Sequence, residues 1–170
     1  VVNTVGGWLQ GAGSVDYSGV APGSSPTGMG YGLLIDGQST VVGNVVNAGY
    51  IMGDGIVSNF SGSSGSSRVG SGLGLLRSSL ITGDISNTGL ITGMSNGVHI
   101  DFFSSIGGSI INAAGATIVG SSSAGLRVGG YSTVAGGISN SGLIQGSNGV
   151  AITTMSTLVG SIVNSYGATI

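Results

Sequence analysis

The sequence predicts an all-β fold, a parallel β-solenoid (β-helix) whose short strands coil around a shared core, and three observations support this prediction. Glycine supplies 37 of the 170 residues, only 5% of residues are charged, and mean hydropathy is +0.51. Lysine and glutamate are absent, while serine, threonine and β-branched residues are common, which favours strands over helices. Above all, one residue pattern recurs along the chain, and internal repeats of this length are typical of solenoids.

The repeated block begins at a glycine, carries aliphatic residues at offsets 1, 3, 9 and 13, has glycine again at offset 11 and ends in asparagine at offset 15. Five copies fit, starting at Gly32, Gly72, Gly97, Gly125 and Gly149. Their starts are 40, 25, 28 and 24 residues apart, so length varies only after the asparagine. We expect residues 32–170 to form about five coils of 24–28 residues, with three short strands in each coil.

Aligning the copies places like residues in columns. Side chains alternate faces along a strand, and one repeat cannot cover its own apolar face, so successive coils must stack to enclose it. We therefore expect five internal aliphatic columns, the clearest of which is at offset 13 and holds Val45, Ile85, Ile110, Ile138 and Ile162.

The closing asparagines mark corners, and equivalent amides on stacked coils can hydrogen-bond along the axis. We expect such a ladder from Asn47, Asn87, Asn112, Asn140 and Asn164. The alternative is that each asparagine only caps its own turn.

Offset 6 holds a mixed column, in which the last three members suggest a bulky stack near a corner. We interpret it as ordinary packing rather than a ligand platform. Its members are Gln38, Ser78, Phe103, Tyr131 and Met155.

Two segments fit the pattern poorly. Residues 1–31 are expected to form an irregular cap or contact segment, although Val1-Val2-Asn3 resembles offsets 13–15 of a block. Residues 54–71 are expected to form an inserted loop rich in serine and glycine. Both chain ends fall within coils, so we expect either further coils of the same chain or head-to-tail stacking of identical copies.

Several functions are disfavoured by the composition. Three arginines without a cluster give little attraction for nucleic acid, and no apolar run is long enough to insert into a membrane. With one histidine and no cysteine a zinc site is not expected, and neither repeated calcium-binding aspartates nor a phosphate-binding Gly-Lys loop occurs. We expect no cofactor.

One charged cluster is predicted by stacking. His99 and Arg127 share offset 2 on consecutive coils, and Asp101 lies at offset 4, so the three should meet on an outer face. We interpret them as a surface electrostatic group rather than a proton-transfer site. Asp36 and Asp101 fall two coils apart, which gives no obvious carboxylate pair for glycoside hydrolysis. The chain is therefore not expected to be an enzyme.

The run from Gly83 to Gly93, GDISNTGLITG, and the matching run from Gly136 to Gly146, GGISNSGLIQG, carry a resemblance to a known family. They resemble the passenger repeats of bacterial autotransporters and related type V secreted adhesins, over about residues 32–170. The resemblance implies a right-handed β-helix displayed outside a Gram-negative cell. It brings no catalytic residue to this chain.

We therefore expect an extracellular structural protein that self-associates end to end into a fibre or forms the stalk of an adhesin, with a host or surface glycan as a possible ligand. A carbohydrate-binding or polysaccharide-degrading β-helix protein is the alternative.

Overall fold

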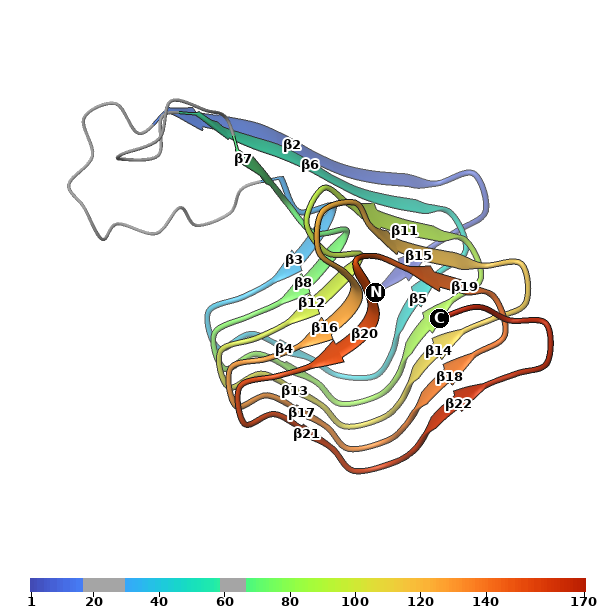
Figure 1. Ribbon diagram of the computed structural model, residues 1–170. Helices are drawn as coiled ribbons and strands as arrows, with labels where there is room; N and C mark the ends of the chain where they lie inside the picture. The colour runs from blue at the N-terminus through green and yellow to red at the C-terminus, as the bar shows by residue number, and fades with distance from the viewer. Residues whose placement is uncertain (17–29, 59–66) are drawn as a thin grey trace.

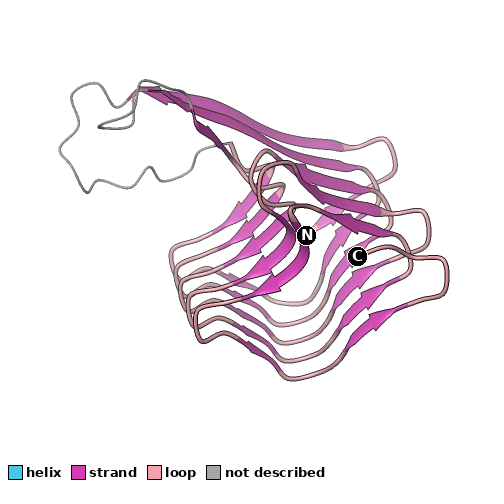
Figure 2. Cartoon of the chain, viewed as in Figure 1, coloured by secondary structure: helices cyan, strands magenta, loops and turns pink. Residues whose placement is uncertain are grey.

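The chain forms a parallel β-solenoid, as predicted, in the computed structural model (Figure 1). The structure describes residues 1–16, 30–58 and 67–170. Within these ranges the chain consists of strands, loops and turns, without a helix (Figure 2).

Four sheets run along the stack, and we name them A to D. Sheet A contains β1 (Val2–Asn3), β5 (Val45–Asn47), β10 (Ile85–Asn87), β14 (Ile110–Asn112), β18 (Ile138–Asn140) and β22 (Ile162–Asn164). Sheet B contains β2 (Trp8–Asp16), β6 (Tyr50–Ser58), β11 (Leu90–Gly93), β15 (Thr117–Gly120) and β19 (Leu143–Gln145), with β7 (Ser67–Val69) paired to β6. Sheet C contains β3 (Leu33–Ile35), β8 (Leu73–Leu75), β12 (Val98–Ile100), β16 (Ala124–Val128) and β20 (Asn148–Ile152). Sheet D contains β4 (Thr40–Val41), β9 (Leu80–Ile81), β13 (Ser105–Ile106), β17 (Thr133–Val134) and β21 (Thr157–Leu158).

Each complete coil therefore passes through four sheets, in the order C, D, A, B, and not through the three strands that the sequence predicted. The additional strand belongs to sheet D, where every strand has only two residues. A two-residue strand is too short to show the alternation by which strands are recognised in a sequence.

The register between coils keeps equal offsets opposite each other. In sheet A, Ile110 of β14 faces Ile85 on one side and Ile138 on the other. In sheet C, Val98 faces Leu73 and Leu126 in the same way. Because every coil repeats this register, the five aliphatic columns run parallel to the axis.

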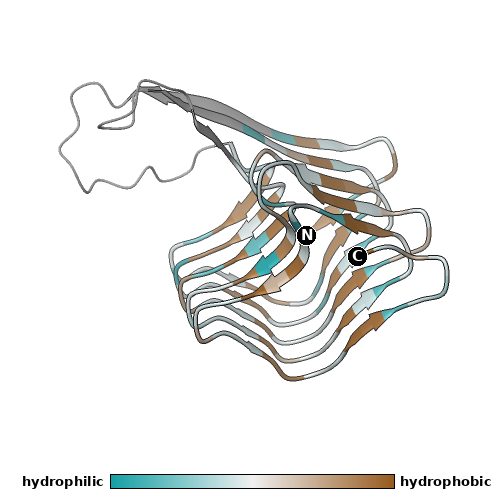
Figure 3. Ribbon diagram, in the orientation of Figure 1, coloured by the Kyte–Doolittle hydropathy of each residue, from teal (hydrophilic) through white to brown (hydrophobic). Residues whose placement is uncertain are grey.

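The columns form the interior of the solenoid. Ile85, Ile110 and Ile138 are at most 1% exposed and belong to one continuous apolar core. Figure 3 shows the apolar segments lined up from coil to coil. At the last described coil Ile162 is 46% exposed, because no further coil lies over it in the structure.

Residues 1–16 are part of the solenoid rather than an irregular cap. Strand β1 pairs in parallel with β5, which places Asn3 opposite Asn47. Strand β2 pairs with β6 over its whole length, with Leu9 opposite Ile51. Residues 17–29 of the predicted cap lie outside the described residues.

The segment predicted as an inserted loop is largely an extension of sheet B where the structure describes it. Strand β6 continues past the point where β11 ends, and β7 returns antiparallel to it. In Figure 1, β2, β6 and β7 extend together beyond the coils. Residues 59–66 of this segment lie outside the described residues.

Candidate functional site

The asparagines lie in one continuous chain of side-chain hydrogen bonds. The Nδ2 of each residue donates to the Oδ1 of its equivalent on the next coil, at 2.8–2.9 Å. The chain contains Asn3, Asn47, Asn87, Asn112, Asn140 and Asn164. Asn3 is thus a sixth member that the block alignment did not include.

Each amide also bonds to nearby backbone, so the asparagines form the predicted ladder and cap their own turns as well, and the alternative that they only cap turns is wrong. Asn87 Nδ2 lies 3.1 Å from the carbonyl oxygen of Gly89 in its own turn and 3.1 Å from that of Thr117 on the next coil. Asn87, Asn112 and Asn140 are at most 1% exposed. A buried amide with its partners in place stabilises the corner, whereas an unpaired one would destabilise it.

A second polar ladder, which was not predicted from the sequence, lies at offset 7. The backbone N–H of each serine donates to the hydroxyl of the serine on the next coil, at 3.1–3.3 Å. Its members are Ser39, Ser79, Ser104, Ser132 and Ser156. The signal was present, because offset 7 is serine in all five copies.

The predicted charged cluster forms on the outer face of sheet C. His99 Nε2 lies 3.1 Å from Asp101 Oδ2 and donates to it when that nitrogen carries the proton. Arg127 Nη2 lies 3.5 Å from the same oxygen. The Asp101 side chain is only 9% exposed, and its other oxygen accepts the backbone N–H of Phe102 at 2.8 Å.

These contacts determine the charge state of Asp101. Burial alone would raise its pKa, but hydrogen bonds from His99 and the Phe102 backbone, with the charges of His99 and Arg127, lower the pKa overall. Asp101 therefore remains ionised to lower pH than an exposed aspartate. It acts as a buried anchor that ties sheet C to the following corner.

Tyr31 covers part of this face. A Cβ atom on Gly74 would lie 2.6 Å from two carbons of the Tyr31 ring, so glycine is needed for the ring to lie against β8. Burial raises the pKa of the Tyr31 hydroxyl, and the Asp101 carboxylate raises it further, while Arg77 opposes them. The phenol is therefore neutral beside the charged cluster.

The corner between sheets C and D has an unusual backbone. In three coils, two successive residues other than glycine have positive φ at this corner. They are Arg77 and Ser78 (53° and 60°), Phe102 and Phe103 (55° and 61°), and Thr154 and Met155 (52° and 56°). In the other two coils glycine takes the first position, at Gly37 before Gln38 and at Gly130 before Tyr131. This conformation costs a residue other than glycine about 1–2 kcal/mol, so these corners are strained.

The large side chains at this corner point outward, and two of those at offset 6 form the bulky stack that we expected. Phe102, Phe103, Tyr131 and Met155 are 55%, 63%, 49% and 78% exposed. Phe103 and Tyr131 stack on each other, with ring centroids 5.1 Å apart and planes inclined by 5°. More than half of each phenylalanine nevertheless remains in water.

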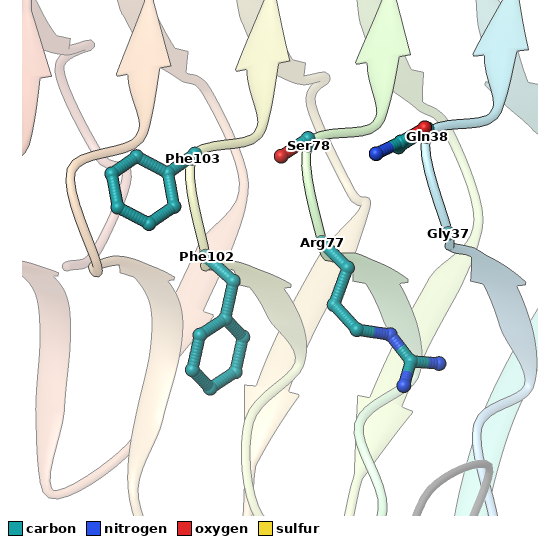
Figure 4. Close-up of a pocket in the computed structure, with 6 residues that line it drawn as sticks. All are labelled: Gly37, Gln38, Arg77, Ser78, Phe102 and Phe103. Atoms are coloured by element: carbon teal, nitrogen blue, oxygen red, sulfur yellow. The ribbon is translucent and has the colours of Figure 1, made fainter.

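A shallow groove of about 370 Å³ lies along this corner and crosses three coils. We call it the corner groove, and it is lined by Gly37, Gln38, Arg77, Ser78, Phe102 and Phe103. In Figure 4 the Gln38 amide turns toward Ser78, and the two phenylalanines lie on the opposite side of Ser78. The groove therefore presents amide, hydroxyl and aromatic groups side by side.

The charges around the groove are paired within the protein. Arg77 forms an ion pair with Asp36, and its Nε donates to Asp36 Oδ1 at 2.6 Å. In residues 1–16, 30–58 and 67–170 no group of three or more His, Asp or Glu side chains could hold a metal ion. The same part of the chain contains no helix long and apolar enough to cross a membrane.

Comparisons of the chain with protein-family models, with curated proteins and with solved structures found no match. The resemblance to autotransporter passengers therefore stays a prediction from the repeated motif.

Proposed function

We propose that this chain is a stretch of an extracellular bacterial β-solenoid that serves as a fibre or as the stalk of an adhesin, and not as an enzyme. The observation that supports this most strongly is the unbroken asparagine chain, which links every described coil from Asn3 to Asn164. Together with the buried columns, it makes each coil dependent on its neighbours and the stack resistant to bending.

The repeated motif supports the location. Its likeness to passenger repeats of autotransporters and type V adhesins favours display outside a Gram-negative cell. An exterior poor in charged residues is compatible with that setting, since only 5% of all residues are charged.

Extension of the stack is supported by the register, which is the same between successive described coils. Ile162 takes this register on one face of the last described coil. We propose that another coil covers this face, supplied by the same chain or by a second copy. Either one would use the inter-coil contacts already present.

Location is tested on intact producing cells with an antibody against the chain. We expect the antibody to bind, and external protease to remove the signal without lysing the cells. A signal that appears only after lysis would contradict extracellular display.

End-to-end assembly is tested by light scattering across a concentration series. Copies that stack should increase in mass above 16.3 kDa as concentration rises. Ile162→Asp should suppress this increase, whereas Val163→Asp, on the neighbouring outward-facing residue, should not. A constant monomer mass would exclude self-assembly and leave extension to further coils of one chain.

A further inference from the structure

The two phenylalanines of the corner groove are poorly explained by folding alone. Phe102 and Phe103 both have positive φ, at 55° and 61°, which glycine or asparagine would adopt with less strain. They are also 55% and 63% exposed, so burial does not compensate for that strain. Strained, exposed aromatic side chains are typical of surfaces that contact something outside the protein.

Contacts within the protein position the Phe102 backbone and the Phe103 ring. Asp101 precedes Phe102, and its carboxylate accepts the Phe102 backbone N–H at 2.8 Å while paired with His99 and Arg127. On the next coil Tyr131 stacks against the Phe103 ring. The aromatic surface is therefore ordered before any ligand arrives, which lowers the entropic cost of binding.

The shape of the groove suits a ring-shaped ligand. Gln38, Ser78 and Phe103 occupy the same offset on three consecutive coils. With coils about 4.8 Å apart, Gln38 and Phe103 stand about 9.6 Å apart along the axis, with only the small Ser78 between them. A single pyranose ring can lie over the small Ser78 and beside the Gln38 amide, and reach toward the Phe103 ring, which Figure 4 shows directed away from Ser78.

The chemistry of the groove selects an uncharged ligand. Arg77 is neutralised by Asp36, and Asp101 is paired with His99 and Arg127, so a charged ligand would have to compete with existing ion pairs. The C–H face of a sugar packs on an aromatic ring, and its hydroxyls can bond to the Gln38 amide and the Ser78 hydroxyl. An entirely apolar partner would leave those polar groups unpaired.

We propose that the corner groove is a binding site for a neutral glycan, with Phe102 and Phe103 as the stacking platform and Gln38 and Ser78 as hydroxyl partners. This inference adds a ligand to the proposed function. It rests on that function only for the extracellular setting in which the protein would encounter the glycan.

The test is calorimetric titration of the purified chain with three neutral hexasaccharides: cellohexaose, chitohexaose and mannohexaose. Hexagalacturonate serves as the acidic comparison. We expect at least one neutral hexasaccharide to bind with a dissociation constant of millimolar or tighter, and Phe103→Ala to weaken it at least tenfold. Phe103→Tyr should retain binding. Met155→Ala, at the equivalent corner position outside the groove, should change affinity by less than twofold.

Folding is followed in parallel by thermal melting. Phe103→Asn should melt near the wild-type temperature, because the tolerance of asparagine for positive φ offsets the lost stack on Tyr131, and should still lose binding. Loss of affinity without loss of stability separates a binding residue from a structural one. Gln38→Ala, a change of an exposed polar side chain, provides a second variant that is expected to fold and to bind at least threefold more weakly.

Three results of the titrations would overturn the inference: no binding of any neutral hexasaccharide at 5 mM, binding of hexagalacturonate alone, or neutral binding unchanged in the Phe102→Ala/Phe103→Ala double variant. Capture of a protein through these residues without sugar binding would also overturn it. Surface display with no sugar binding would refute this inference but leave the proposed function intact. Sugar binding by a chain found only inside cells would support this inference and refute the proposed extracellular function.

Discussion

Asn112 is the residue at which the amide chain can be tested most directly. It accepts from Asn87 and donates to Asn140, at 2.9 and 2.8 Å, and it is 1% exposed. Asn112→Ala would leave polar atoms on both neighbouring coils without one of their partners. We expect a loss of about 2–3 kcal/mol in the free energy of unfolding, measured by urea denaturation. Ser139→Ala, an outward-facing change in the next coil, should alter stability by no more than about 0.5 kcal/mol.

Asp101 should make stability sensitive to acid. Its pKa in the folded protein lies below the ordinary value of 3.8, so its ionised form favours folding above that value, and this contribution is lost as pH falls through the lowered pKa. Melting temperatures between about pH 5 and pH 2 should therefore fall less steeply for Asp101→Asn than for wild type. Asp54→Asn, on sheet B, is the control. Parallel curves for wild type and Asp101→Asn would contradict the role given to the carboxylate.

At this scale the sequence predicted some polar positions and not others. The asparagine column stood out because asparagine is distinctive at a corner. The serine column at Ser79, Ser104 and Ser132 is equally regular, but serine is so frequent in this chain that its buried role was not recognised. The left-handed backbone at Phe102 was not predictable, because bulky residues seldom adopt it.

At the scale of the single strand, β14 offers a matched pair of substitutions. Ile110 points into the core and is 0% exposed, while its neighbour Ile111 faces outward. Ile110→Asp would bury an unpaired charge between two coils, and we expect it to cost more than about 4 kcal/mol or to prevent folding. Ile111→Asp should cost about 1 kcal/mol or less. Chemical denaturation of both variants would check this, and equal stability would show that the column is misassigned.

Most strands in sheets A, B and C were predictable from alternating aliphatic residues, but the strands of sheet D and parts of sheet B were not. The strands of sheet D are too short to alternate. Strand β2 was missed because Trp8-Leu9-Gln10-Gly11 was not aligned with Tyr50-Ile51-Met52-Gly53, its partner in the structure. The paired part of β6 and β7 lies in a segment whose serine and glycine content is typical of loops.

At the scale of the whole molecule, coils should be removable as units. Deleting residues 97–124 removes one coil and joins Asn96 directly to Gly125. Gly97 and Gly125 are both the first residue of a block, so Asn96 again directly precedes the start of a block. The aliphatic columns remain in register, so we expect a folded protein with the same circular dichroism spectrum and one coil fewer. Deleting residues 97–110 breaks the columns and should give an unfolded or aggregated product. Similar behaviour of the two deletions would argue against stacking of equivalent coils.

The repeat spacing was enough to predict the coil boundaries, because strands β3, β8, β12, β16 and β20 begin within a residue of the expected positions. Function was far less accessible from the sequence. The corner groove forms where outward-facing side chains of three coils meet. To predict it, one must know the exact register between the coils and the direction in which the chain turns at each corner.

The asparagine chain also has a direction. Each of the five bonds between coils is donated toward the coil that follows in the sequence, so the five bond dipoles add rather than cancel. One end of such an array carries free acceptor capacity and the other carries free donor capacity. Two solenoids placed tail to tail would bring amide donors against donors, and only a head-to-tail arrangement would continue the array. An assembly that continued this array would therefore be polar, with two chemically distinct ends.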